Sequence, residues 1–219
     1  MYEEYENELL ALNNLYNSIP PTRCLKTECS NWCCSRLPSA VNKEGNFISL
    51  PLIYSIEYIN IKKFVYEHFS KEEIKEFFNY DNKKRLCCFK DINSPNCKIY
   101  PVRPFTCRVF GRKVPPIFWG IEYPPEAVDN IYCENCEVVD KNKEKEFIDK
   151  FPSYWQILAG LSVRVSVFDR EKLNRMNKVA GVNNIFILGW KEFALLDNAS
   201  IEWIEKEFSR FWEIHKKLL

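Results

Sequence analysis

The sequence predicts a mainly α-helical protein with a small, irregular cysteine-rich core of short strands, an α+β arrangement in a single domain over residues 1–219. Apolar residues recur at three- and four-residue steps over several segments, as in amphipathic helices. All ten cysteines lie between residues 24 and 136, where prolines and polar turn residues break these patterns. Because 46% of the 219 residues are hydrophobic, the chain can bury a sizeable core, and a disordered protein is not expected.

The charge balance and the cysteine content limit the classes of function. The 31 basic and 30 acidic residues leave a net charge of +1, so no charge excess would attract a nucleic acid. The N-terminus is acidic where a secretory signal would be basic, and no apolar run approaches the roughly 18 residues that span a bilayer. We therefore expect a cytoplasmic protein without nucleic-acid or membrane partners. In a reducing cytosol, ten cysteines favour metal ligands over disulfides.

A helix is predicted at the N-terminus, ended by Ile19-Pro20-Pro21. Its apolar face recurs at helical steps and would dock on the body of the protein. The residues of this face are Tyr2, Tyr5, Leu9, Leu12 and Tyr16.

The first cysteine group follows, with Cys24, Cys29, Cys33 and Cys34. Spacings of two to four residues allow a tight turn to bring two thiolates to one metal ion. Consecutive side chains tend to point apart, so Cys33 and Cys34 fit poorly around one tetrahedral ion. The adjacent pair therefore indicates a cluster, two neighbouring metals, or one ligand beside a cysteine that does not bind.

Two further helices are predicted between residues 53 and 78. Apolar residues follow a helical rhythm through the first of them. Ser70 and Glu73 form a capping box for the second, whose apolar face would carry Ile74, Phe77 and Phe78.

The central stretch is predicted to contain two short extended segments, residues 86–89 and 97–100, joined by a polar loop. The loop would bring one of the cysteines at positions 87 and 88 close to Cys97. Pro101 and Pro104 then predict an extended course that allows Cys107 to fold back to the same place.

Two arginines of this stretch, Arg103 and Arg108, lie beside the group of thiolates in the sequence. Their guanidinium groups would offset negative charge and donate hydrogen bonds to sulfur or to carbonyl oxygen. The alternative is that each is an ordinary surface charge.

The last two cysteines, Cys133 and Cys136, have the two-residue spacing of a metal knuckle. Thioredoxin-like redox pairs have the same spacing, but the βαβ pattern that should surround such a pair is missing from the sequence. We therefore interpret both cysteines as metal ligands.

Residues 145–219 are predicted to form a helical C-terminal region. Residues 141–145 would be a solvated run of charges, followed by a helix with Pro152 near its first turn. The apolar face of that helix contains Tyr154, Leu158, Leu161, Val165 and Phe168. A last helix carries Ile201, Ile204, Phe208, Phe211 and Trp212, after the candidate caps Asp197, Asn198 and Ser200.

Several catalytic motifs are missing from the sequence. Only six glycines occur and they do not cluster, which argues against a Rossmann phosphate turn and a P-loop. There is no G-x-S-x-G elbow and no H-E-x-x-H, and the two histidines lie far apart. A hydrolase is therefore not expected.

Three stretches of the cysteine-rich region match a known pattern. They are Cys29-Ser30-Asn31-Trp32-Cys33-Cys34, a cysteine before Phe89, and Cys97-Lys98-Ile99-Tyr100-Pro101-Val102-Arg103-Pro104-Phe105-Thr106-Cys107-Arg108-Val109-Phe110. They resemble the YkgJ-type cysteine-cluster family, described as a zinc- or iron-chelating domain with a C-x-x-C-x-x-C-C signature and a later C-x-I-Y-x-x-R-P-x-x-C-R segment. The later segment matches position by position. In the first group, four and three residues separate cysteines where two and two are common in the family.

The resemblance covers residues 22–136 and implies a metal-binding region there. It selects Cys87 over Cys88, because the family places a phenylalanine two residues after the ligand. It also implies that Tyr100, Arg103 and Arg108 lie beside the cofactor. A weaker similarity exists to the cysteine-rich module of flagellin lysine N-methylases, larger proteins that are thought to need an iron–sulfur cluster.

Three functions are consistent with these observations. The favoured one is a cysteine-ligated metal-binding protein that holds an iron–sulfur cluster and has a redox or metal-handling role. The alternatives are an iron–sulfur-dependent modifying enzyme of the methylase type, and an interaction module built on structural zinc. The partner would be a protein or a small molecule. The nine predicted metal ligands are Cys24, Cys29, Cys33, Cys34, Cys87, Cys97, Cys107, Cys133 and Cys136.

Overall fold

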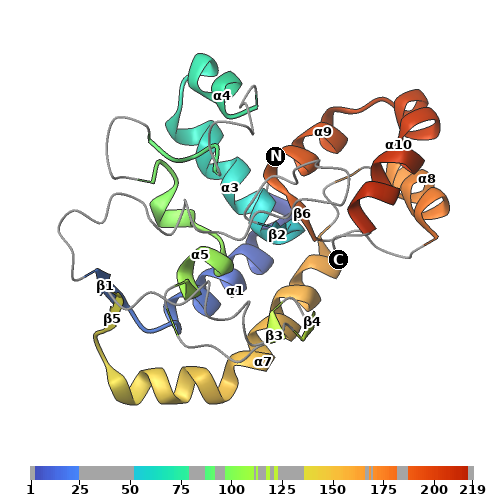
Figure 1. Ribbon diagram of the computed structural model, residues 1–219. Helices are drawn as coiled ribbons and strands as arrows, with labels where there is room; N and C mark the ends of the chain where they lie inside the picture. The colour runs from blue at the N-terminus through green and yellow to red at the C-terminus, as the bar shows by residue number, and fades with distance from the viewer. Residues whose placement is uncertain are drawn as a thin grey trace.

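The computed structural model describes residues 3–24, 52–78, 87–91, 97–110, 112, 117–118, 121–122, 136–165, 168, 170–181 and 187–216. Within these residues the protein is mainly helical, with three two-stranded antiparallel sheets between the helices (Figure 1). The prediction of a mainly α fold with a small content of short strands is therefore confirmed.

The predicted N-terminal helix is confirmed, although Tyr5 lies in the turn before it and Tyr2 lies outside the described residues. A 3-10 turn, η1 (Glu3–Tyr5), leads into α1 (Glu6–Asn17). Leu9, Leu12 and Tyr16 are buried on one face of α1, as the helical spacing of these residues requires. This face docks α1 on the helical body of the protein.

The next two helices, α3 (Ser55–His68) and α4 (Lys71–Phe78), are also confirmed. The predicted capping box of α4 is present. The Ser70 N–H donates to the Glu73 carboxylate at 3.0 Å, and the Glu73 N–H donates to Ser70 Oγ at 3.3 Å. In α3, residues 55–61 are all buried, because α1 and two later helices pack around it.

Short antiparallel pairings tie distant parts of the chain together. The pairs are β1 (Thr22–Cys24) with β5 (Cys136–Val138), β2 (Leu52–Tyr54) with β6 (Ile187–Gly189), and β3 (Ile117–Phe118) with β4 (Ile121–Glu122). In the second pair, the buried residues Ile53 and Leu188 lie opposite each other. The β2–β6 pair therefore joins the start of α3 to the C-terminal helices.

Helix α7 (Lys141–Arg164) corrects two predictions. Residues 141–145 were expected to precede a helix, but they form its first turn, and Pro152 lies inside the helix rather than near its start. Asp140 caps the helix, because its carboxylate accepts from the N–H groups of Asn142 and Lys143, both at 3.1 Å.

Burial explains why α7 begins so early. Phe147 and Phe151, which precede the proline, are 1% and 0% exposed. Their transfer out of water offsets the backbone hydrogen bond that Pro152 cannot donate. The helix ends at Arg164, so Val165 and Phe168 are buried beyond its end and are not part of its face.

Three helices complete the C-terminal region: α8 (Arg170–Ala180), α9 (Trp190–Asn198) and α10 (Ile201–Lys216). Gly181, with a φ of 66°, ends α8 in the left-handed conformation that favours glycine. The predicted cap Ser200 is confirmed, because its Oγ accepts from the Trp203 N–H at 3.2 Å. Helices α8 and α10 pack against each other at one side of the molecule (Figure 1).

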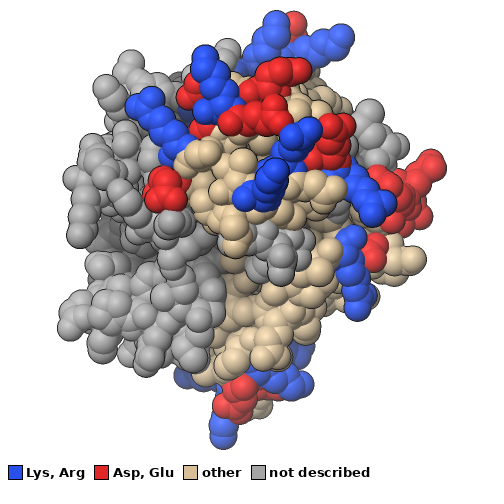
Figure 2. Space-filling model, turned by 90° about the vertical axis from the view of Figure 1, so that its right-hand side faces the viewer, with Lys and Arg blue, Asp and Glu red and all other residues tan. Residues whose placement is uncertain are grey.

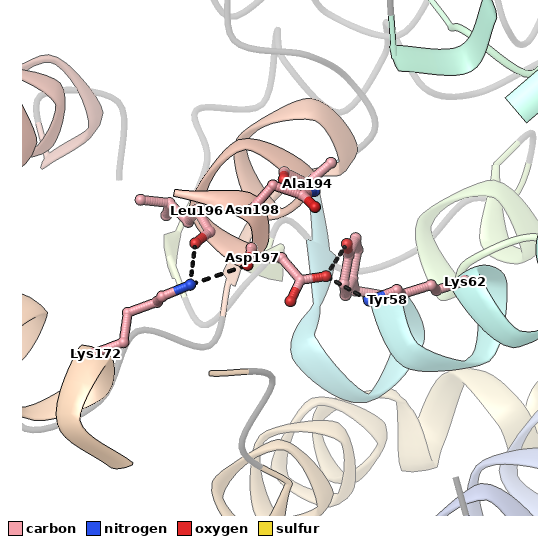
Figure 3. Close-up of polar contacts among 7 residues, drawn as sticks. All are labelled: Tyr58, Lys62, Lys172, Ala194, Leu196, Asp197 and Asn198. Atoms are coloured by element: carbon pink, nitrogen blue, oxygen red, sulfur yellow. Dashed lines mark hydrogen bonds and ion pairs between the residues drawn. The ribbon is translucent and has the colours of Figure 1, made fainter. Parts of the chain in front are cut away.

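A polar cluster joins α8 and α3 to the C-terminal end of α9 (Figure 3). Lys172 Nζ, on α8, donates to the carbonyl oxygens of Leu196 at 3.3 Å and Asp197 at 3.0 Å. The Asp197 carboxylate accepts from Tyr58 Oη at 2.9 Å and pairs with Lys62, both on α3. The buried ammonium of Lys172 is thus stabilised by the carbonyl end of a helix.

The helices and the cysteine-rich stretch share one contiguous cluster of buried side chains. The Trp190 ring lies 4.9 Å from the rings of Tyr58 and Phe89, measured between centroids. Phe105 packs edge-on against Trp155 at 4.6 Å. Residues 87–91 and 97–110 are therefore anchored in the same core as α3, α7 and α9.

The face shown in Figure 2 carries lysine and arginine side chains intermixed with aspartate and glutamate. This arrangement agrees with the net charge of +1. Among the helices of the described ranges, none has the length and apolar content needed to cross a membrane.

Candidate metal-binding region

The structure describes the side chains of four predicted ligands. Cys87 is buried, and Cys97, Cys107 and Cys136 are half-buried. For Cys24 the backbone is described, whereas the other four predicted ligands, Cys29, Cys33, Cys34 and Cys133, lie outside the described residues. In the part of the chain that is described, no three histidine, cysteine, aspartate or glutamate residues form a group that could hold a metal ion.

The pairing of β1 with β5 brings the two ends of the cysteine-rich region together. In this register Cys24 lies directly opposite Cys136, and Arg23 opposite Glu137. The Arg23 and Glu137 side chains form an ion pair at 2.6 Å, which supports the same register. A strand of three residues has no periodicity to reveal its partner, so the sequence did not predict this pairing.

Residues 86–89 and 97–100 were predicted to be short extended segments, but the described residues 87–91 and 97–100 are mainly turns, which lie side by side. Lys90 forms a single antiparallel bridge with Cys97, and the Lys98 N–H donates to the Phe89 carbonyl at 2.9 Å. Phe89 anchors the first segment, since its ring packs against Phe77 and Trp190.

Cys87 and Cys88 are both buried within this anchored turn, at 6% and 8% exposure. The Cys88 thiol is hydrogen-bonded to Cys87, and burial together with this neighbour raises the pKa of Cys88 well above its usual value. The choice of Cys87 over Cys88 as the ligand stays a prediction.

The extended course that Pro101 and Pro104 predicted is wrong. Residues Tyr100–Val102 form a 3-10 turn, η2, and Phe105–Val109 form a short helix, α5. Pro101 is compatible with the first turn of η2, and Pro104 occupies the N-cap of α5, where a missing N–H costs nothing. Cys107 is therefore presented from a one-turn helix.

Arg108 forms hydrogen bonds to the segment between Pro101 and α5. Its Nε donates to the Arg103 carbonyl at 2.8 Å and its Nη2 donates to the Pro101 carbonyl at 2.7 Å. Its guanidinium lies 4.0 Å from the centroid of the Tyr16 ring. The hydrogen bonds to carbonyl oxygen that were predicted for this arginine are therefore present, and contact with a cofactor stays a prediction.

Arg103 has a different environment. Its guanidinium stacks on the Tyr100 ring at 4.3 Å from the centroid, and Tyr100 is 56% exposed. The buried Nε of Arg103 has no hydrogen-bond acceptor among the described residues. Burial lowers the pKa values of Arg108 and Arg112, and the positive charge of Arg103 adds to the lowering in both.

Arg112 is a site residue that the sequence did not indicate. It is 2% exposed, pairs with Glu144 at the start of α7, and donates to the Pro20 carbonyl just before β1. Burial lowers its pKa, while Glu144 and Cys136 oppose that effect. Arg112 therefore ties the segment after α5 to the place where β1 and β5 meet.

Glu57 is the second site residue that the sequence did not indicate. It is 0% exposed and accepts hydrogen bonds from Tyr16, Tyr54 and Phe105. One signal could have found it: Glu57 is the charged residue inside the apolar run from Ile53 to Ile59, and a charge is rarely buried without partners.

The chain matches no family model, no curated protein and no solved structure. The similarity to the YkgJ-type family stays a prediction from the sequence.

Proposed function

We propose that this protein is a cysteine-ligated metal-binding protein that holds an iron–sulfur cluster and has a redox or metal-handling role. The observation that carries the proposal is the β1–β5 register, which sets Cys24 opposite Cys136. Directly opposed positions of an antiparallel pair have Cβ atoms about 4.5–5.5 Å apart. Two thiolates at such positions can share one metal site, with metal–sulfur distances of about 2.3 Å.

The charges near the described cysteines favour an anionic, thiolate-bound group. Burial lowers the pKa of Arg108 and of Arg112, and the nearby Cys107 and Cys136, respectively, oppose that shift. Arginines in such positions offset the negative charge of thiolates and of the cluster that they bind.

The ligands of such a group would be cysteine sulfur atoms. His68 is turned to its own helix, because its Nδ1 lies 2.9 Å from the Phe64 carbonyl and its ring stacks on Phe64. The thiolates would come from the nine predicted ligands, Cys24, Cys29, Cys33, Cys34, Cys87, Cys97, Cys107, Cys133 and Cys136. An iron–sulfur cluster takes four thiolates and supplies one-electron transfer when bound.

Arg103 and Arg108 would then have separate roles. The Nε and Nη2 donors of Arg108 already serve backbone carbonyls, so Arg108 maintains the shape of residues 101–108. Arg103, stacked on the exposed Tyr100 ring, has a buried Nε without an acceptor among the described residues. Arg103 is therefore the arginine that would donate to the cofactor or to an anionic small molecule.

Spectroscopy and metal analysis of anaerobically purified protein test the proposal. We expect a brown protein with iron and acid-labile sulfide. Cys107→Ser and Cys87→Ser should lose colour and iron, because each removes a predicted ligand. Cys88→Ser is the matched control, since Cys88 is the adjacent buried thiol, and it should keep both. A colourless protein that carries zinc and gains no cluster when reconstituted with iron and sulfide would contradict the proposal.

Structural zinc is the second candidate, and the same register favours it. Cys136 belongs to a pair with the two-residue spacing of a zinc knuckle, and Cys24 lies opposite it. In that case the protein would be an interaction module whose fold depends on zinc. One or two equivalents of zinc, with no iron, would select this function.

A further inference from the structure

Glu57 is a buried charge that needs a physical reason. It lies in α3 at 0% exposure, between Ile56 and Tyr58 at 0% and 1%. Burial disfavours the ionised carboxylate and raises the pKa of Glu57. A buried charge without partners is strongly destabilising, so the hydrogen-bond partners of Glu57 show what the residue does.

The carboxylate accepts three hydrogen bonds from three elements. Oε2 accepts from the Tyr54 N–H at 2.9 Å, at the start of α3. Oε1 accepts from Tyr16 Oη of α1 at 2.7 Å and from the Phe105 N–H of α5 at 2.6 Å. The bond to Tyr54 is local and any capping glutamate would make it. The other two bonds connect α3 to segments far away in the sequence.

The bond to Phe105 serves α5. Phe105 is the first residue of this five-residue helix, and Pro104 provides no side-chain cap. A helix of one turn is not stable by itself in water, and its first N–H groups need acceptors from elsewhere. Glu57 supplies one of these acceptors, two residues before Cys107.

The hydrogen bond from Tyr16 connects Glu57 to residues 101–103 as well. The Tyr16 ring lies beneath the guanidinium of Arg108 at 4.0 Å. Arg108 in turn holds the carbonyls of Pro101 and Arg103. Glu57 therefore contacts the start of α5 directly and reaches residues 101–103 through Tyr16 and Arg108.

From this geometry we infer that Glu57 is a positioning residue for Cys107: its carboxylate holds α5 in the place from which Cys107 meets the metal. The assignment of Cys107 as a ligand rests on the proposed function. The holding of α5 by Glu57 does not, and the two can be tested separately.

The first test compares full-length wild-type protein, as purified, with Glu57→Gln and Glu73→Gln. Glutamine keeps the size of Glu57 but replaces one acceptor oxygen with a donor. Glu73→Gln is the matched control, because Glu73 makes the same local bond at the start of α4 and is only partly buried. The readouts are the alkylation rate of Cys107 by iodoacetamide and the hydrogen exchange of residues 105–109, both by mass spectrometry.

We expect Glu57→Gln to speed both readouts about tenfold or more, as the loss of a hydrogen bond to a charged group would. Glu73→Gln should react like wild type. If Glu57→Gln matches wild type in both readouts, the inference is overturned. If Glu57→Gln does not fold, Tyr16→Phe decides, since it keeps the ring beneath Arg108 and removes one donor. A faster reaction of Cys107 then supports the inference, and a wild-type rate overturns it.

The second test has a readout that a purely structural role would not move. The same variants are produced in cobalt-supplemented medium, and the thiolate-to-cobalt charge-transfer bands are recorded. Weaker or shifted bands in Glu57→Gln at equal cobalt content support the inference, and unchanged bands overturn it. If wild-type protein takes up neither iron, zinc nor cobalt, the proposed function fails, and the alkylation test still decides whether Glu57 holds α5.

Discussion

Glu57 and Glu73 make the same local contact in very different surroundings. Each carboxylate accepts a hydrogen bond from the backbone N–H three residues earlier, at the start of a helix. Burial raises the pKa of Glu57 above the ordinary value of 4.5, although its three donors and Arg108 oppose the shift. Glu73 is only partly buried, and its hydrogen bonds to Ser70 lower its pKa below 4.5. Access to water therefore decides the direction of the shift.

These opposite shifts predict opposite pH dependences of stability. A raised pKa in the folded state means that the contribution of Glu57 is fully present below pH 4.5 and is lost as the pH rises through the folded pKa. A lowered pKa means that the contribution of Glu73 is present above pH 4.5 and is lost as the pH falls through the folded pKa.

Urea unfolding of wild type, Glu57→Gln and Glu73→Gln between about pH 4 and pH 7 measures both effects. With rising pH, the free energy of unfolding of wild type should fall relative to Glu57→Gln and should rise relative to Glu73→Gln. Each variant serves as the control for the other. Parallel trends for the two pairs would mean that burial does not dominate the titration of Glu57.

At the scale of elements, α7 shows burial overriding a helix-breaking residue. Pro152 lies inside its 24 residues and is exposed. Proline cannot donate to the carbonyl four residues earlier and its ring crowds that carbonyl. The helix continues because the residues on both sides of Pro152, including Phe151, Tyr154 and Trp155, bury large side chains in the core.

Pro152→Ala should therefore stabilise the protein. Alanine restores the missing N–H and has a higher helix propensity, and the exposed position loses no buried contact. We expect the free energy of unfolding in urea to rise by about 1–3 kcal/mol. Gln156→Ala, at another exposed position of α7, is the control and should change stability by less than about 0.5 kcal/mol. A less stable Pro152→Ala would mean that proline acts mainly by restricting the unfolded chain.

At the scale of the whole molecule, the cysteine-rich segments and the helices unfold as one unit if they share one core. Phe89 packs on Trp190 of α9, and Phe105 packs on Trp155 of α7. A loss of order around Cys87, Cys97 or Cys107 would therefore expose aromatic surface of the helical body. The stability of α7 and α9 is coupled to the cysteine-rich stretch for this reason.

Metal removal should then lower the melting temperature of the whole protein. Thiolates brought together from separate segments repel one another until a cation neutralises them. Structural zinc contributes on the order of 10–16 kcal/mol in small domains, which is comparable with the roughly 5–15 kcal/mol stability of a whole domain. Circular dichroism melts with and without a strong chelator measure the effect, and restoring the metal should restore the transition. An unchanged melt after verified removal would contradict it.

The local sequence pattern was sufficient to predict a helix and its buried residues where the helix buries one apolar face. Tyr16 with Leu9 and Leu12, Ile74 with Phe77, and Ile204 with Phe208 are buried where their spacing placed them. The Ser70–Glu73 box and the Ser200 cap were also readable, since each involves residues three apart in the sequence. The approach of Cys97 to the segment that carries Cys87 and Cys88 followed from a short loop, but the turns within both segments did not.

Contacts between distant segments were decided by the tertiary structure. Strands of three residues have no periodicity from which the pairing of Cys24 with Cys136 could be predicted. The start of α7 depends on the burial of Phe147 in the core. The sequence determined that this is a mainly helical protein with its cysteines grouped in one region, because periodicity and composition are local properties. Only the tertiary structure decided that Glu57 and Arg112 connect the segments of that region. A buried charge is stable only where donors or acceptors from distant segments form hydrogen bonds or ion pairs with it.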